Sequence, residues 1–115
     1  MPRVVSVQNP YFLLNRSYEV AFAEVSNRER PGVLAYLPSG FGVLSGKYLF
    51  GAMLEGSRLN FYPDYARYSS ENSSKAMAMY VSLAKEHGLK PAQMALAYIN
   101  DRAFITANII GATKM

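Results

Sequence analysis

The sequence predicts an α/β protein with a parallel sheet, and three observations lead to that fold class. Short runs of β-branched and aliphatic residues occur early, in the middle and at the end of the chain. Longer segments with apolar residues at helical spacing alternate with these runs. The first two runs lie about 30 residues apart with a helix-like segment between them, which is the spacing of a parallel crossover unit.

The first crossover unit begins with the valine-rich segment of residues 3–8, whose continuous apolar run is typical of a strand buried on both faces. A helix is expected next, starting with Asn15 or Ser17 as its N-cap and ending near Asn27. Its apolar residues would form one buried face: Tyr18, Phe22 and Val25. The second strand is expected over residues 33–36.

The rest of the chain is expected to hold a long loop, two helices and a third strand. Residues 37–70 are rich in glycine and aromatic residues without a sustained period, which favours a functional loop. A helix over residues 73–87 should stop at Gly88, and a second should cover residues 91–101. The first of these two helices would bury Ala76, Tyr80, Leu83 and Ala84. Residues 105–110 are predicted to form the last strand.

A sheet of three parallel strands is too small to close into a barrel. An open sheet of this kind leaves two edges of unpaired N–H and C=O groups, which must be covered or paired with another chain. We therefore expect residues 1–115 to form a single unit that is structurally incomplete.

Composition excludes several classes of site and partner. The chain has no cysteine and a single histidine, so disulfides, thiolate nucleophiles and multi-histidine metal sites are excluded, and we expect no metal. No apolar run is long enough to cross a membrane, which makes a cytoplasmic protein the expectation. The 9 tyrosines and 6 phenylalanines could stack on bases, but most fall at helix or strand spacing, so we expect core positions and no nucleic-acid partner.

A glycine cluster with a lysine follows the predicted second strand, where parallel sheets bind ligands. A Walker A loop does not fit, because Phe41 occupies its first glycine position and Tyr48 its last. The dinucleotide fingerprint fits at Gly40 and Gly42 and fails at Ser45. On the motif alone, the glycines could equally well only turn a loop.

Four stretches of the chain together resemble the aldo-keto reductase superfamily, in its bacterial Tas-like branch, which is similar to the potassium-channel beta subunits. Residues 5–16 look like the family's sixth strand, and residues 34–48 resemble its seventh strand and the loop after it. Residues 88–98 and 109–113 are similar to the helix before the eighth strand and to that strand's end. The resemblance implies a partial (β/α)8 TIM barrel that comprises strands six to eight with their helices.

The resemblance implies a role in binding NADP(H). Gln8 would hydrogen-bond the carboxamide side of the cofactor, and the ring of Tyr36 would stack on the nicotinamide. Lys47 would place a positive charge near the phosphates, and Arg58 matches a basic position in the family's long loop, where a solvated surface charge is the alternative. The residues expected to surround the pyrophosphate and the adenosine phosphate are Leu37, Pro38, Ser39, Gly40, Gly42, Leu44, Ser45, Gly111 and Thr113.

The catalytic residues of the family have no counterpart in this chain. The resemblance implies hydride transfer between NADP(H) and a carbonyl, with a tyrosine, a lysine, an aspartate and a histidine supplied by earlier strands. We therefore expect a C-terminal fragment that contacts the cofactor and is inactive alone. The alternative is a non-enzymatic interaction module whose exposed barrel edges pair with a second copy or with a complementary barrel fragment.

Overall fold

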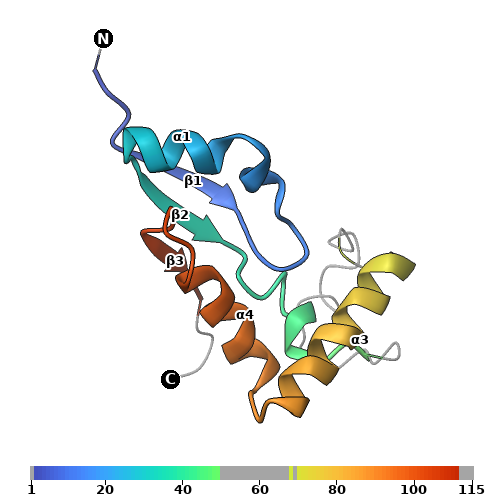
Figure 1. The fold of residues 1–115 in the computed structure, drawn as a ribbon. Helices are drawn as coiled ribbons and strands as arrows, with labels where there is room; N and C mark the ends of the chain where they lie inside the picture. The colour runs from blue at the N-terminus through green and yellow to red at the C-terminus, as the bar shows by residue number, and fades with distance from the viewer. Residues whose placement is uncertain (1, 50–67, 69, 112–115) are drawn as a thin grey trace. The chain divides into compact units, whose positions relative to one another are not determined.

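The computed structural model describes residues 2–49, 68 and 70–111. Along the chain the elements are β1 (Ser6–Pro10), η1 (Ser17–Val20), α1 (Phe22–Glu29), β2 (Gly32–Tyr36), η2 (Val43–Ser45), α3 (Glu71–Glu86), α4 (Pro91–Asn100) and β3 (Ala107–Ile109) (Figure 1). The predicted order of strands and helices is confirmed, although several boundaries differ from those expected.

The three strands form one parallel sheet in the order β1-β2-β3. The register pairs Pro10 with Tyr36 and Tyr36 with Ile109, so the last residues of all three strands lie in one row. The parallel arrangement predicted from the crossover spacing is therefore correct.

Contacts divide the chain into two compact units, one made of Met1–Pro38 and Leu96–Met115 and the other of Ser39–Ala95. The first unit contains the sheet and buries Tyr11, Phe12, Tyr18, Val33, Ala35 and Ile99. In this core the ring of Phe104 packs edge-on against Tyr11, with centroids 5.2 Å apart, and stacks on Tyr18 at 5.6 Å. The core beneath the strands is therefore largely aromatic.

The first strand begins later than predicted, at Ser6 instead of residue 3. Val4 and Val5 precede it and are 62% and 83% exposed. The expectation of a strand buried on both faces is therefore wrong at this end. The valine run was interpreted as core because a continuous apolar run does not distinguish a buried strand from exposed residues that precede a strand.

The predicted buried face of the first helix is only partly correct. A short 3-10 helix, η1, precedes α1, and the chain breaks between them at Ala21, where φ is −144°. The break changes the helical phase, so Tyr18 is buried while Phe22 and Val25 are 62% and 50% exposed. The buried residue of α1 is Ser26, whose hydroxyl lies 2.6 Å from that of Tyr18.

The second unit is built around α3 and η2. Helix α3 starts at the N-cap Ser70, whose hydroxyl accepts a hydrogen bond from the Ser73 N–H. Gly88 follows with φ +66°, which confirms the predicted left-handed stop. The predicted face is only partly correct, because α3 buries Met77, Val81 and Ala84 while Leu83 is 43% exposed.

Candidate functional site

The carboxyl edge of the sheet is the candidate site, because ligands of parallel α/β sheets bind beyond the carboxyl ends of the strands. Pro10, Tyr36 and Ile109 form the last row of this edge. Gln8 lies two rows further back, paired with Leu34, which in turn pairs with Ala107. Gly111 follows the end of β3 by two residues and is exposed. The edge therefore gathers three of the predicted cofactor residues: Gln8, Tyr36 and Gly111.

Gln8 and Tyr36 lie on the same face of the sheet. Side chains alternate between the two faces along a strand, and paired residues of neighbouring strands share a face. Gln8 pairs with Leu34, and Tyr36 lies two residues beyond Leu34 on the same strand. Gln8 and Tyr36 therefore lie on the same face of the sheet. The opposite face carries Val33 and Ala35, which are 1% and 0% exposed. The face of Gln8 and Tyr36 is thus the more open of the two.

This open face can receive a flat ligand. The side chain of Gln8 is exposed and forms no hydrogen bond in the part of the chain that the structure describes, so its donor and acceptor are both available. Tyr36 is half-buried at the end of β2 and offers part of a flat ring. An aromatic face beside a free amide suits a planar ring that carries a carboxamide.

The glycine loop of the second unit is held by its own backbone. The N–H groups of Gly42 and Leu44 both donate to the carbonyl of Ser39, at 3.0 and 3.1 Å. The N–H groups of Ser39 and Gly40 donate to nothing in the described part of the chain. Two of the backbone amides predicted to bind phosphate are therefore engaged within the loop, whereas those of Ser39 and of the buried Gly40 have no partner in the described part of the chain.

Left-handed backbone conformations shape this loop. Gly40, Phe41 and Gly42 follow one another with φ of +56°, +60° and +89°, and Gly46 has φ +81°. A Cβ added at Gly42 would lie 2.8 Å from Cε of Lys47 and 3.0 Å from its Nζ. Gly42 is thus required both by its conformation and by the close approach of the lysine.

The ammonium of Lys47 lies over the loop. Its Nζ is 4.9 Å from the centroid of the Tyr48 ring, within the range of a cation–π contact. The Ser45 hydroxyl donates to the Gly42 carbonyl at 2.6 Å and accepts from the Lys47 N–H at 3.4 Å. The lysine, serine and glycine predicted to surround the phosphates are therefore close to one another.

The remaining predicted site residues are placed as follows. Leu37 and Pro38 follow Tyr36 directly, Leu37 with φ +62° and Pro38 buried. Arg58 and Thr113 lie outside the described residues. In the described part of the chain no group of acidic, histidine or cysteine side chains could hold a metal ion.

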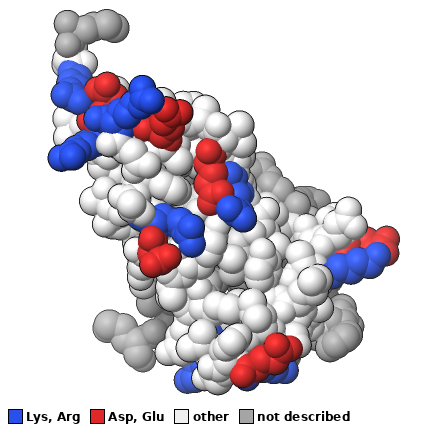
Figure 2. Space-filling view, in the orientation of Figure 1, with Lys and Arg blue, Asp and Glu red and all other residues white. Residues whose placement is uncertain are grey.

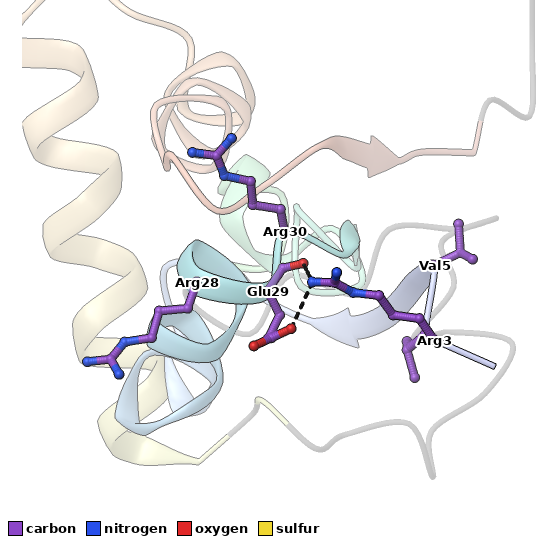
Figure 3. A pocket seen from close by; sticks show the side chains of 6 residues that line it. Arg3, Val5, Arg28, Glu29 and Arg30 are labelled. Carbon is purple, nitrogen blue, oxygen red and sulfur yellow. Dashed lines mark hydrogen bonds and ion pairs between the residues drawn. The ribbon is translucent and has the colours of Figure 1, made fainter. Parts of the chain in front are cut away.

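A pocket of about 420 Å³ lies before the first strand, lined by Arg3, Val4, Val5, Arg28, Glu29 and Arg30. Arg3 donates to the carboxylate and to the carbonyl of Glu29, at 2.8 and 2.7 Å, and Figure 3 shows Arg28 and Arg30 pointing away from that pair. The three guanidinium groups diverge, so they do not form a common anion site. Arg28 in the last turn of α1 and Arg30 at its C-cap instead complement the helix dipole.

Charges of both signs alternate over the region of α1, where Figure 2 shows basic and acidic side chains side by side. The ion pairs there include Arg28 with Glu24 at 2.6 Å and Arg3 with Glu29 at 2.8 Å, all with exposed side chains. Exposed pairs of this kind contribute little to stability. They also leave no surface of a single sign that would attract a polyanion.

One cluster near the site was missed by the sequence interpretation. The hydroxyl groups of Tyr11 and Tyr98 meet the carboxylate of Glu19, which also pairs with Arg16. Arg16 and Glu19 are three residues apart, a spacing that can signal an ion pair. Nothing in the sequence indicates that Tyr98 joins them, because it lies 87 residues from Tyr11.

Comparisons with known proteins agree on one family. The model of the Aldo/keto reductase family matches residues 1–115. Protein tas of Escherichia coli (strain K12) is 51% identical over 115 residues, which are 100% of this chain and 33% of that protein. An aldo-keto reductase of Babesia bovis is 34% identical over 113 residues, covering 93% of this chain and 40% of its own length.

A solved structure shares the fold. The glycerol dehydrogenase from Gluconobacter oxydans superposes with a TM-score of 0.69 at 21% identity, over 90% of this chain and 33% of that one. The chain thus spans well under half of the length of these relatives. Among the described residues, no helix is both long and apolar enough to cross a membrane.

Proposed function

Because the chain belongs to the aldo/keto reductase family, we propose that it is the part of an NADP-dependent carbonyl reductase that contacts the nicotinamide cofactor. In this proposal β1, β2 and β3 are strands six to eight of an eight-stranded barrel. The parallel sheet and the 33% coverage of the solved relative support it. We further propose that the protein acts in the cytoplasm and binds no nucleic acid.

The observation that carries the proposal is the common face of Gln8 and Tyr36 at the carboxyl edge. The Gln8 amide would donate to and accept from the carboxamide, and the Tyr36 ring would fix the plane of the nicotinamide. When bound, the nicotinamide supplies the hydride for reduction of a carbonyl carbon. The two residues of this chain orient that ring and do not transfer protons.

The glycine loop would hold the phosphates. The N–H groups of Ser39 and Gly40 have no partner in the described part of the chain, and Lys47 provides a positive charge beside Gly42. Phosphate oxygens accept several hydrogen bonds, and closely spaced backbone amides together with one ammonium can donate them. Leu37, Pro38, Leu44 and Ser45 would also line the phosphates, Arg58 would add a basic group from the long loop, and Gly111 and Thr113 would contact the adenosine phosphate.

Hydride transfer also requires an acid that protonates the carbonyl oxygen, and we propose that this chain does not provide it. Tyr11 is the tyrosine nearest the end of β1, but its hydroxyl donates to Glu19. Burial and the bond to Glu19 both raise the pKa of Tyr11, so this phenol does not release its proton readily. The acid would come from the remaining two thirds of a complete barrel.

A titration of the chain with NADPH, followed by cofactor fluorescence, tests this function. Saturable binding is expected for the wild type, and Tyr36→Leu and Gln8→Ala should each weaken it about tenfold, since each removes one ring or hydrogen-bond contact. Ser82→Ala, on an exposed face of α3, is the matched control and should bind like the wild type. Equal affinity in all four proteins would reject the proposed contacts.

A second candidate function is supported by the sheet edges. In the described part of the chain β1 and β3 each pair only with β2, and neither strand contains a charged residue. Proteins often protect a free edge with charges, and these two edges have none, although β1 ends in Pro10 and β3 has only 3 residues. We propose pairing with a second copy or with a complementary barrel fragment; a strict monomer in sedimentation, with and without NADPH, would exclude self-association.

A further inference from the structure

A four-residue cluster, which we term the Glu19 cluster, consists of Tyr11, Arg16, Glu19 and Tyr98. Arg16 donates to Oε2 of Glu19 from Nε at 3.0 Å and from Nη2 at 2.5 Å. Tyr11 and Tyr98 both donate to Oε1, the latter at 3.2 Å. The carboxylate thus joins the residue after β1, the short helix η1 and the end of α4.

The protonation of the Glu19 cluster is fixed over a wide pH range. The hydrogen bonds from Arg16 and then from Tyr11 lower the pKa of the Glu19 carboxyl to about 2. The pKa of Tyr11 is raised, mainly by burial, so its hydroxyl remains a donor. The hydroxyl oxygens of Tyr11 and Tyr98 and Oε1 of Glu19 share two phenolic protons, and both protons are directed at the negative charge of Glu19. The hydrogen bonds of the cluster therefore do not depend on a change of protonation near neutral pH.

The aromatic rings strengthen the same connection. Tyr11 is fully buried, its ring stacks on Tyr98 with centroids 6.0 Å apart, and its edge contacts Phe104. The guanidinium of Arg102 covers the Tyr98 ring at 4.6 Å. Phe104 lies in the segment that leads into β3. The cluster therefore connects the end of β1 with the segments that precede β3, although these two strands are not neighbours in the sheet.

The end of β1 needs such a connection. In the described part of the chain β1 is hydrogen-bonded to β2 along one edge only. The Gln8 side chain has no hydrogen-bond partner there, so the backbone alone sets its position. Tyr11 lies three residues beyond Gln8, after the rigid Pro10, and is the first buried side chain beyond the strand. Segments with few buried contacts and exposed backbone hydrogen bonds open locally at low free energy, so a buried contact at the end of β1 stabilises it against such opening.

We propose that Glu19 is a positioning residue that holds the carboxyl end of β1 through Tyr11 and thereby fixes the Gln8 amide for the cofactor. The inference rests on the proposed role of Gln8 as a cofactor contact. It goes beyond that role because Glu19 itself touches no cofactor and acts through the tyrosine.

Amide hydrogen exchange, measured by NMR on the full chain, tests the structural half of the proposal. Glu19→Gln keeps the size of the side chain and removes its charge, and exchange at the end of β1 and at Tyr11 should become at least about tenfold faster. Glu24→Gln is the matched control, because Glu24 forms an exposed ion pair on α1. Unchanged exchange at β1, or equal acceleration throughout the sheet, would overturn the proposal.

A milder variant covers the case in which Glu19→Gln does not fold. Tyr98→Phe keeps the ring that stacks on Tyr11 and removes only one donor to Glu19. It should accelerate exchange at the same positions to a smaller extent. Normal exchange at β1 in a folded Tyr98→Phe protein, together with failure of Glu19→Gln to fold, would show a general structural role and overturn the proposal.

NADPH affinity tests the functional half. Weaker binding by Glu19→Gln, with rapid exchange confined to β1, supports the proposal, and Gln8→Ala should then add little to the loss in the double variant. Rapid exchange at β1 with unchanged NADPH affinity overturns the positioning role and leaves the contact by Tyr36 intact. Failure of the wild type to bind NADPH removes the proposed function, and hydrogen exchange still decides whether Glu19 holds β1.

Discussion

Glu19 is the residue whose charge matters most in the first unit. Its carboxylate accepts hydrogen bonds from an arginine and from two tyrosines, and its side chain is only 26% exposed. These bonds lower its pKa from the ordinary 4.5 to about 2. A carboxyl whose pKa is lower in the folded state stabilises that state above its unfolded pKa and loses this contribution as the pH falls through its folded pKa.

We therefore predict a specific loss of stability in acid. Between pH 4.5 and about 2 the free energy of unfolding of the wild type should fall more steeply than that of Glu19→Gln, which has no carboxyl to protonate. Urea unfolding followed by circular dichroism at several pH values measures both slopes. Glu24→Gln should behave like the wild type, and identical slopes for wild type and Glu19→Gln would disprove the assignment.

The strand positions of individual residues could be predicted from their neighbours in the sequence. Contacts between residues far apart in the sequence could not. Gln8 and Tyr36 were singled out through the family resemblance, and the register puts them on one face of the sheet. Tyr98 lies 87 residues from Tyr11, so only the fold could bring their hydroxyls to 3.1 Å. No periodicity in the sequence encodes such a contact.

Among the elements, α3 has the clearest end. After its last turn, the Leu89 N–H donates to the Ala84 carbonyl at 2.8 Å, and Gly88 between them has φ +66°. This is the pattern in which a left-handed residue reverses the chain and satisfies the last carbonyls. A Cβ added at Gly88 would meet nothing within 4 Å, so only the backbone conformation opposes a side chain.

Gly88→Ala should accordingly lower the free energy of unfolding by about 1 kcal/mol, which is the cost of a left-handed conformation for a residue with a Cβ. Gly111→Ala is the matched control, because its added Cβ also meets nothing within 4 Å and its φ is not in the left-handed region. Thermal or urea unfolding of both variants measures the difference. Equal stability of the two variants would show that Gly88 does not cap α3.

Element order was predicted more accurately than element faces. The strands were found because their apolar runs are bounded by turn-forming residues. The predicted face of the first helix was correct at Tyr18 and wrong at Phe22 and Val25, because Ala21 separates two helical segments and a single continuous helix was assumed. Val4 and Val5 were taken for core because an apolar run alone does not reveal whether another strand lies beside it.

For the molecule as a whole, the order and direction of the strands in the parallel sheet fit a segment of a barrel. The length of the chain corresponds to a third of a complete barrel protein. It covers 33% of both Protein tas and the solved glycerol dehydrogenase. The carboxyl edge holds residues suited to bind a planar ring, while the described residues offer no acid beside them. Cofactor contact and catalysis are thus expected to lie on different parts of a complete barrel.

The isolated chain should consequently show no turnover. With NADPH and a reactive aldehyde, its rate should not exceed that of buffer, because hydride transfer without a positioned acid loses much of its acceleration. A steady-state absorbance assay of NADPH oxidation checks this expectation, with an intact family member as the positive control. A rate well above buffer would mean that the chain contains its own acid.

Gln8 and Tyr36 lie on one open face of the sheet, which we propose receives the nicotinamide. An NMR titration of the full chain with NADP⁺ tests it most directly, by following the side-chain amide of Gln8 and the ring of Tyr36. Both signals are expected to shift together and to saturate at the same ligand concentration. Saturable binding that leaves both signals unchanged, with shifts instead at Arg3, Arg28 and Arg30, would contradict it.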